Sequence, residues 1–104
     1  LQVWLRIGPW AHGECRNGGF PDWVVNDTRW KVRTNDPAYL KLVETFYRRI
    51  GEQAKGMMCR DGGPVIGIQL ENEYGHCGGP SDREEGMAHM RILKRMASEA
   101  ALSA

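Results

Sequence analysis

Three residues that could do chemistry, Glu71, Asn72 and Glu73, follow directly on an apolar run at residues 65–70. Burying an unpaired carboxylate at the end of a core strand costs on the order of several kcal/mol. A cleft at the carboxyl-terminal face of a parallel sheet or barrel would account for these groups, because strand ends deliver catalytic side chains there. The pattern therefore predicts a site at the tip of this run.

Glu73, the outermost carboxylate, suits the role of proton donor to the leaving oxygen of a glycosidic bond. A buried glutamate beside another negative charge has a raised pKa and can supply a proton near neutral pH. A retaining mechanism needs a second carboxylate about 5 to 5.5 Å away, on the other face of the sugar. Spacing alone does not identify that second carboxylate.

Alternation along the strand predicts how the tip is arranged. A two-residue period places Gln69, Glu71 and Glu73 on one side and Leu70 and Asn72 on the other, unless a bulge at the tip re-aims them. Within this arrangement Glu71 is interpreted as a supporting or core-network residue.

A second loop could contribute to the same site. Residues 10–23 combine glycines, aromatic rings and hydrogen-bonding side chains, among them Glu14. Such a mixture suits a sugar, whose C–H faces stack on rings while its hydroxyls take fixed donors and acceptors. Since this loop follows a predicted parallel strand at residues 3–7, Glu14 and Glu73 are expected at the same edge of the sheet and could share a ligand.

The elements that must position these groups alternate between strand and helix. Strands are predicted at residues 3–7 and 65–70. One helix is predicted from Asp36, its N-cap, to about residue 59, and another from residue 81 or 82 to about 101. Their apolar stripes recur every three or four residues, at Leu40, Val43, Tyr47, Ile50, Ala54 and Met57 in the first and at Met87, Met90, Leu93 and Met96 in the second. This order predicts an α/β fold with a right-handed parallel crossover.

Size and charge limit the classes of function. The chain has 104 residues and a net charge of +1, so it forms one domain at most and neither nucleic acid nor a membrane is expected as a partner. Cys15, Cys59 and Cys77 show no Cys-x-x-Cys spacing, which argues against a disulfide framework or a zinc site. The chain is expected to begin in mid-protein, and two parallel strands alone are expected to be unstable.

Four stretches of the chain together resemble glycoside hydrolase family 35, the β-galactosidases. They occur in the order and spacing of that family and extend over nearly the whole chain as far as Gly75. The stretches are residues 5–14 (Leu-Arg-Ile-Gly-Pro-Trp-Ala-His-Gly-Glu), 17–23 (Asn-Gly-Gly-Phe-Pro-Asp-Trp), 33–37 (Arg-Thr-Asn-Asp-Pro), and 62–64 (Gly-Gly-Pro) with 69–75 (Gln-Leu-Glu-Asn-Glu-Tyr-Gly).

The resemblance implies a partial (β/α)8 TIM barrel in which this chain supplies the third and fourth βα units, at residues 1–61 and 62–104. It implies a retaining exo-hydrolase of terminal β-galactose, with Glu73 as general acid/base, Asn72 near the sugar 2-hydroxyl and Glu14 on other galactose hydroxyls. The nucleophile would be a glutamate of a later strand, beyond Ala104. The rest of the barrel would therefore be needed for folding and activity, and this fragment alone would be inactive. No metal or organic cofactor is called for.

Some details stay open within this resemblance. Many family members have Tyr-Ile-Cys-Ala-Glu-Trp at residues 10–15, so the shape around the sugar could differ, and Trp10 could either stack on substrate or simply pack. Arg6 is expected in an ion pair under the site. Alternatives are another two-carboxylate barrel glycosidase (β-glucosidase, β-mannosidase or exo-β-glucosaminidase) or a non-catalytic carbohydrate-binding relative. The family suggests a secreted, periplasmic or lysosomal protein.

Overall fold

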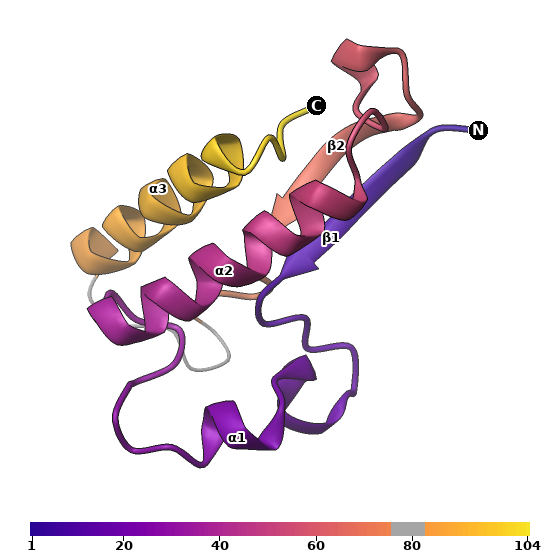
Figure 1. The fold of residues 1–104 in the computed structure, drawn as a ribbon. Helices are drawn as coiled ribbons and strands as arrows, with labels where there is room; N and C mark the ends of the chain where they lie inside the picture. The colour runs from indigo at the N-terminus through magenta and orange to yellow at the C-terminus, as the bar shows by residue number, and fades with distance from the viewer. Residues whose placement is uncertain (76–82) are drawn as a thin grey trace.

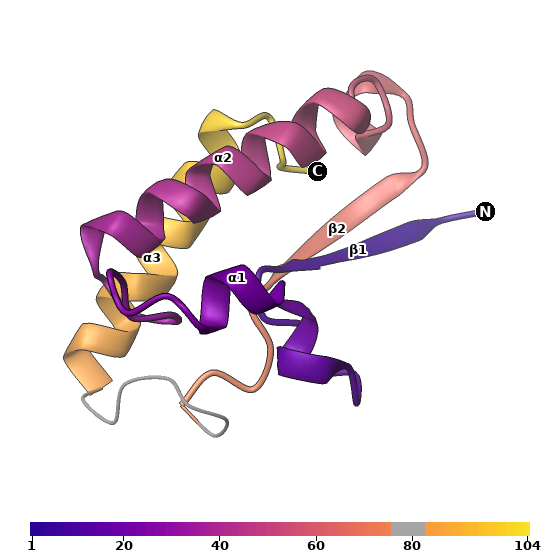
Figure 2. The ribbon, with the colours of Figure 1, turned by 60° about the horizontal axis from the view of Figure 1, so that its bottom comes forward.

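The computed structural model describes residues 1–75 and 83–104. Two parallel strands lie side by side, and two long helices cover one face of this sheet (Figures 1 and 2). In chain order the elements are β1 (Val3–Gly8), the 3-10 turn η1 (Arg16–Gly19), α1 (Asp22–Val25), α2 (Pro37–Gln53), the 3-10 turn η2 (Cys59–Asp61), β2 (Val65–Leu70) and α3 (Arg83–Glu99). The predicted α/β class and parallel crossover are confirmed.

The two faces of the sheet have different roles. Leu5 and Ile68 are register partners that pack against the core under the helices. The partners Arg6 and Gln69 come next along the strands and, by alternation, lie on the face without helices. Trp4 lies on that same face, 63% exposed. The face without helices therefore carries the Trp4 ring and the polar side chains of Arg6 and Gln69.

The first long helix, α2, begins as predicted and ends earlier. The carboxylate of Asp36 accepts a hydrogen bond from the Ala38 backbone N–H at 3.0 Å, which confirms the N-cap. The predicted end near residue 59 is wrong, because Gly56 takes a left-handed conformation and the chain leaves the helix after Gln53. As a result Met57 is 49% exposed and Met58, at 2%, joins the core in its place.

The last helix, α3, packs against α2 through part of its predicted stripe. Leu93 and Met96 are buried, whereas Met87 is 49% exposed and lies outside the core. The predicted start at residue 81 or 82 lies outside the described residues, and the helix ends at Glu99. None of the helices in residues 1–75 and 83–104 has the length and apolarity to cross a membrane.

Gly18 fixes the fold of the loop after β1. It has a φ of +62°, and a Cβ built there would lie 2.2 Å from ring atoms of Trp10. The Trp10 ring also lies 6.0 Å from that of Phe20, which is buried in the core. The loop is therefore held to the core by an indole that covers a glycine.

We expect Gly18→Ala to destabilise this loop more than Gly62→Ala does. Both glycines have a positive φ, so both substitutions carry backbone strain of about 1 kcal/mol, but a Cβ at Gly62 meets no atom within 4 Å. Only Gly18→Ala must also displace the Trp10 ring. Thermal unfolding of the two variants in the intact protein measures the difference. Equal losses would contradict the packing described for Trp10.

Candidate active site

The carboxyl-terminal ends of β1 and β2 are joined at the Gly8 carbonyl. That oxygen accepts one hydrogen bond from the Glu71 backbone N–H and another from the Tyr47 hydroxyl, both at 2.8 Å. Tyr47 comes from α2 and is fully buried. The three elements therefore meet where the candidate site begins.

The tip after β2 does not continue the strand. Glu71 and Glu73 have φ values of +58° and +45°, and the register with β1 shifts between Arg6 and Gly8. The simple alternation that placed Gln69 and Glu71 on one side is therefore wrong, and the alternative of a re-aimed tip describes the structure. Such left-handed residues are strained and are held only by surrounding contacts.

The main contact that holds the tip is a buried ion pair between Arg33 and Glu71. The Arg33 Nη2 donates to Glu71 Oε1 at 2.8 Å and the Arg33 Nε donates to Oε2 at 3.3 Å, with side chains 2% and 1% exposed. Arg33 Nη2 also donates to the Asn72 carbonyl oxygen at 2.8 Å. The supporting role predicted for Glu71 is confirmed, with Arg33 as its partner.

Aromatic rings enclose the Arg33 guanidinium. Its Cζ atom lies 4.7 Å from the centre of the Trp10 ring and 5.5 Å from that of Tyr74. Burial raises the pKa of Glu71 above the ordinary value, while the hydrogen bonds from Arg33 and from the Asn72 backbone N–H oppose that rise. The pair thus lies in apolar surroundings where each charge depends on the other.

Arg6 contacts the site through Asn72. Its Nη2 donates a hydrogen bond to Asn72 Oδ1, so the ion pair predicted for Arg6 is replaced in the structure by a bond to an amide. Gln69 Nε2 donates to the same oxygen at 3.1 Å. Asn72 is therefore held from two neighbouring strands.

Glu14 and Glu73 lie in the loops that follow β1 and β2, and both are exposed. Glu14 has a φ of +58° in the loop that Trp10 begins. Among residues 1–75 and 83–104, no group of three or more His, Cys, Asp or Glu side chains could hold a metal ion.

Trp10 has a clear packing role. Its half-buried ring contacts Gly18, Phe20 and Arg33, and its buried Nε1 atom has no hydrogen-bond partner among the described residues. A contact between Trp10 and a sugar stays a prediction.

A stack of three rings supports the tip from behind. The fully buried His89 ring of α3 lies 5.0 Å from the Tyr74 ring and 6.2 Å from the Tyr39 ring of α2, nearly parallel to both. His89 Nδ1 hydrogen-bonds Asn35 Oδ1 at 2.8 Å, and the Tyr74 hydroxyl donates to the Arg33 carbonyl oxygen at 3.0 Å. Burial, with the nearby Arg33 charge, lowers the pKa of His89 to about 4.

Sequence reasoning assigned no role to several of these residues. Arg33, Asn35 and Tyr74 lie within the stretches that carry the family resemblance, so their place in the pattern was a usable signal. His89 had no such signal, because it lies in the final thirty residues, which carry no motif.

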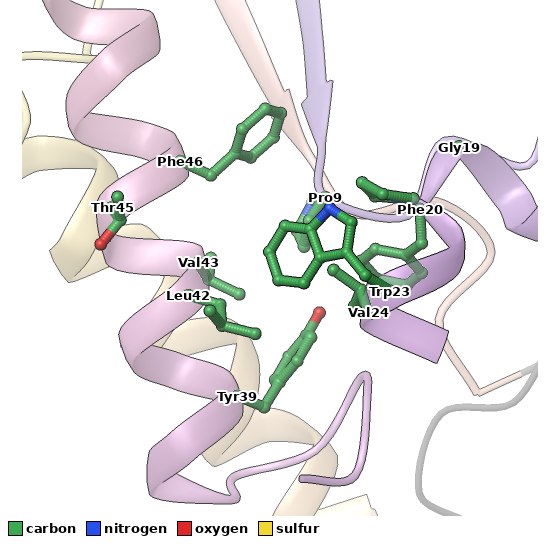
Figure 3. Close-up of a pocket in the computed structure, with 11 residues that line it drawn as sticks. Pro9, Gly19, Phe20, Trp23, Val24, Tyr39, Leu42, Val43, Thr45 and Phe46 are labelled. Carbon is green, nitrogen blue, oxygen red and sulfur yellow. The ribbon is translucent and has the colours of Figure 1, made fainter. Parts of the chain in front are cut away.

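A separate apolar pocket of about 380 Å³ lies between α2 and the segment from Pro9 to Val24 (Figure 3). The Trp23 and Phe46 side chains border it and are 61% and 45% exposed. Among the residues that the structure describes, no carboxylate lines this pocket, and neither Glu14 nor Glu73 is part of its lining. It is not the place where the candidate acid chemistry would occur.

We expect Arg33→Met to lower the free energy of unfolding by about 3 to 5 kcal/mol, because it leaves the Glu71 carboxylate buried and unpaired. The double variant Arg33→Met/Glu71→Leu should lose less than the two single losses together. Arg49→Met is the matched control, since its pair with Glu52 is exposed and worth about 1 kcal/mol or less. Denaturant unfolding of the intact protein measures these variants together with the single variant Glu71→Leu. Additive losses in the double variant would argue against coupling between Arg33 and Glu71.

Acid should destabilise the protein partly through His89. Its folded-state pKa of about 4 lies below the ordinary 6.5, so the unfolded chain takes up this proton first as the pH falls. Stability contributed by neutral His89 is therefore full above pH 6.5 and is lost progressively toward pH 4. The thermal unfolding temperatures of wild type and His89→Gln, measured from pH 6.5 down to pH 4, should show the wild type losing more stability than the variant as the pH falls. A constant difference would contradict this assignment.

Comparison with known proteins shows the family to which the chain belongs. The model of Glycosyl hydrolases family 35 matches residues 1–103. The chain is 43% identical over 96 residues to "Beta-galactosidase 17" of Arabidopsis thaliana, a match that covers 91% of this chain and 13% of that protein. It is 37% identical over 75 residues to "Beta-galactosidase" of Xanthomonas manihotis, covering 72% of this chain and 12% of the relative. For "Beta-galactosidase" of Homo sapiens the identity is 39% over 75 residues, covering 72% and 11%.

The chain thus spans only 11% to 13% of the length of these relatives. The resemblance seen in the sequence is confirmed at the level of the family. Because the family model covers the chain from residue 1 to residue 103, the chain belongs to glycosyl hydrolases family 35.

Proposed function

We propose that the intact protein is a retaining exo-glycoside hydrolase that releases terminal non-reducing β-galactose from oligosaccharides or glycoconjugates. The chain would supply the third and fourth βα units of a (β/α)8 barrel, at residues 1–61 and 62–104. The observation that carries the proposal is the tip of β2, where the buried Arg33–Glu71 pair supports an exposed Glu73 at the carboxyl-terminal edge of parallel strands.

Glu73 would act as the general acid and base. In the first step it would protonate the glycosidic oxygen while a nucleophilic carboxylate on the other face of the sugar forms a covalent glycosyl-enzyme. In the second step it would remove a proton from the water that releases the sugar. The nucleophile would be a glutamate of a later strand, beyond Ala104.

Asn72, Glu14 and Trp10 would bind the galactose. Asn72 adjoins Glu73 and would reach the region of the 2-hydroxyl, whereas Glu14 would accept hydrogen bonds from other hydroxyls. Trp10 would border the same loop. The named relatives support galactose as the sugar, since all three are called beta-galactosidases.

One feature favours a second candidate. Residues 10–15 read Trp-Ala-His-Gly-Glu-Cys, which keeps the acidic position and exchanges its neighbours. A pocket altered there could take glucose, mannose or glucosamine with the same two-carboxylate chemistry. Hydrolysis of the matching aryl glycosides by the intact protein separates these sugars, and a failure to cleave any of them would favour a carbohydrate-binding relative.

We expect Glu73→Ala to reduce kcat/KM by about 10² to 10⁴ for substrates with poor leaving groups, because general acid catalysis contributes that much. With an activated aryl β-galactoside, azide should restore turnover and yield β-galactosyl azide, since the azide ion needs no general base. Glu44→Ala, an exposed position on α2, is the control and should behave as wild type. A Glu73→Ala variant as active as wild type would overturn the assignment.

A further inference from the structure

The face of the sheet without helices carries a chain of hydrogen bonds that ends on Asn72. Arg6 and Gln69 are register partners on adjacent strands. Both donate to the same atom, Asn72 Oδ1, and Gln69 Nε2 also donates to the Glu71 carbonyl oxygen at 3.0 Å. These contacts fix the position of Asn72 and also the orientation of its amide group.

The chemistry of the partners determines which way each amide points. A backbone carbonyl only accepts, so the Glu71 carbonyl requires the NH2 end of Gln69 on its side. A guanidinium only donates, so Arg6 requires the oxygen of Asn72 on its side. The two requirements agree, because Gln69 then also presents a donor to Asn72 Oδ1.

The consequence is a directed donor. With Oδ1 held by two donors, the Asn72 NH2 group must point away from Arg6 and Gln69. No hydrogen bond from that nitrogen occurs among the residues that the structure describes. The Asn72 NH2 group therefore offers two N–H donors at the end of β2, beside Glu73.

We infer that Arg6 and Gln69 are positioning residues that set the amide of Asn72 so that its NH2 group donates to a substrate oxygen. The inference rests on the proposed function, in which Asn72 lies near the 2-hydroxyl of the sugar. The ligand atom must then be an acceptor, which the oxygen of a hydroxyl provides and a 2-deoxy sugar lacks. A reversed amide would place Oδ1 there instead, so the hydroxyl would have to donate to it and could no longer give its proton to another group.

Gln69→Glu tests this inference with almost no change in shape. It replaces the donor that faces Asn72 Oδ1 by a carboxylate oxygen, which repels that atom and opposes the amide orientation that Arg6 favours. Gln53→Glu, at the exposed end of α2, makes the same change of charge away from the site. Arg6→Met and Arg6→Lys form a second pair, of which only lysine keeps a donor.

The readout is kcat/KM of the intact protein for an aryl β-galactoside and for its 2-deoxy analogue. We expect Gln69→Glu and Arg6→Met each to lower the preference for the 2-hydroxy substrate about tenfold, the scale of one hydrogen bond in a closed site. Activity on the 2-deoxy analogue should hardly change, which also shows that the variants are folded. Arg6→Lys should keep part of the preference, and Gln53→Glu all of it.

Asn72→Ala separates the substrate contact proposed for Asn72 from the positioning role of Arg6 and Gln69. It should lose the preference by itself, and adding Gln69→Glu to it should cause no further loss, because both act through one amide. If Asn72→Ala keeps the preference, or wild type has none, the role given to Asn72 in the proposed function fails. If Asn72→Ala loses it while Gln69→Glu and Arg6→Met keep it, or if those two lose both substrates equally, the positioning role alone is overturned.

Discussion

A guanidinium and a carboxylate, each almost fully buried, meet beneath the tip of β2 and hold two left-handed residues in place. Neither charge would be stable there without the other, because desolvation of a lone ion in such surroundings costs more than the neighbouring dipoles return. Arg33 adds a bond to the Asn72 carbonyl oxygen. The direction in which the chain carries Asn72 and Glu73 beyond the sheet therefore depends on this one pair.

Local signals made much of the fold predictable. The strand at Val65–Leu70 and the N-cap at Asp36 are set by residues next to each other in the chain. The early end of α2 was not predictable from its stripe, since the three- and four-residue spacing continues to Met57 beyond the point where the backbone turns away. Periodicity describes which residues could share a face, and Gly56 decides how far the helix extends.

The residue types at the candidate site were also visible, whereas their arrangement was not. Glu71 alone does not reveal that its partner is Arg33, 38 residues earlier, instead of Arg6. That choice depends on how α2 and the loops pack over the sheet. For His89 the chain offered no pattern at all, because a single histidine on an amphipathic helix is as compatible with solvent as with a stack of rings.

The stack of Tyr39, His89 and Tyr74 brings three distant parts of the chain into one column of flat side chains. A column of this kind accepts changes in composition only if the thickness and planarity of each layer are kept. We therefore expect position 89 to accept few residue types, although its side chain makes no hydrogen bond to Glu71, Asn72 or Glu73 among the described residues. In related sequences we expect positions 39, 74 and 89 to vary together, because their rings pack on one another. The residue types that α3 can carry at position 89 are therefore set in part by the packing of the tip of β2.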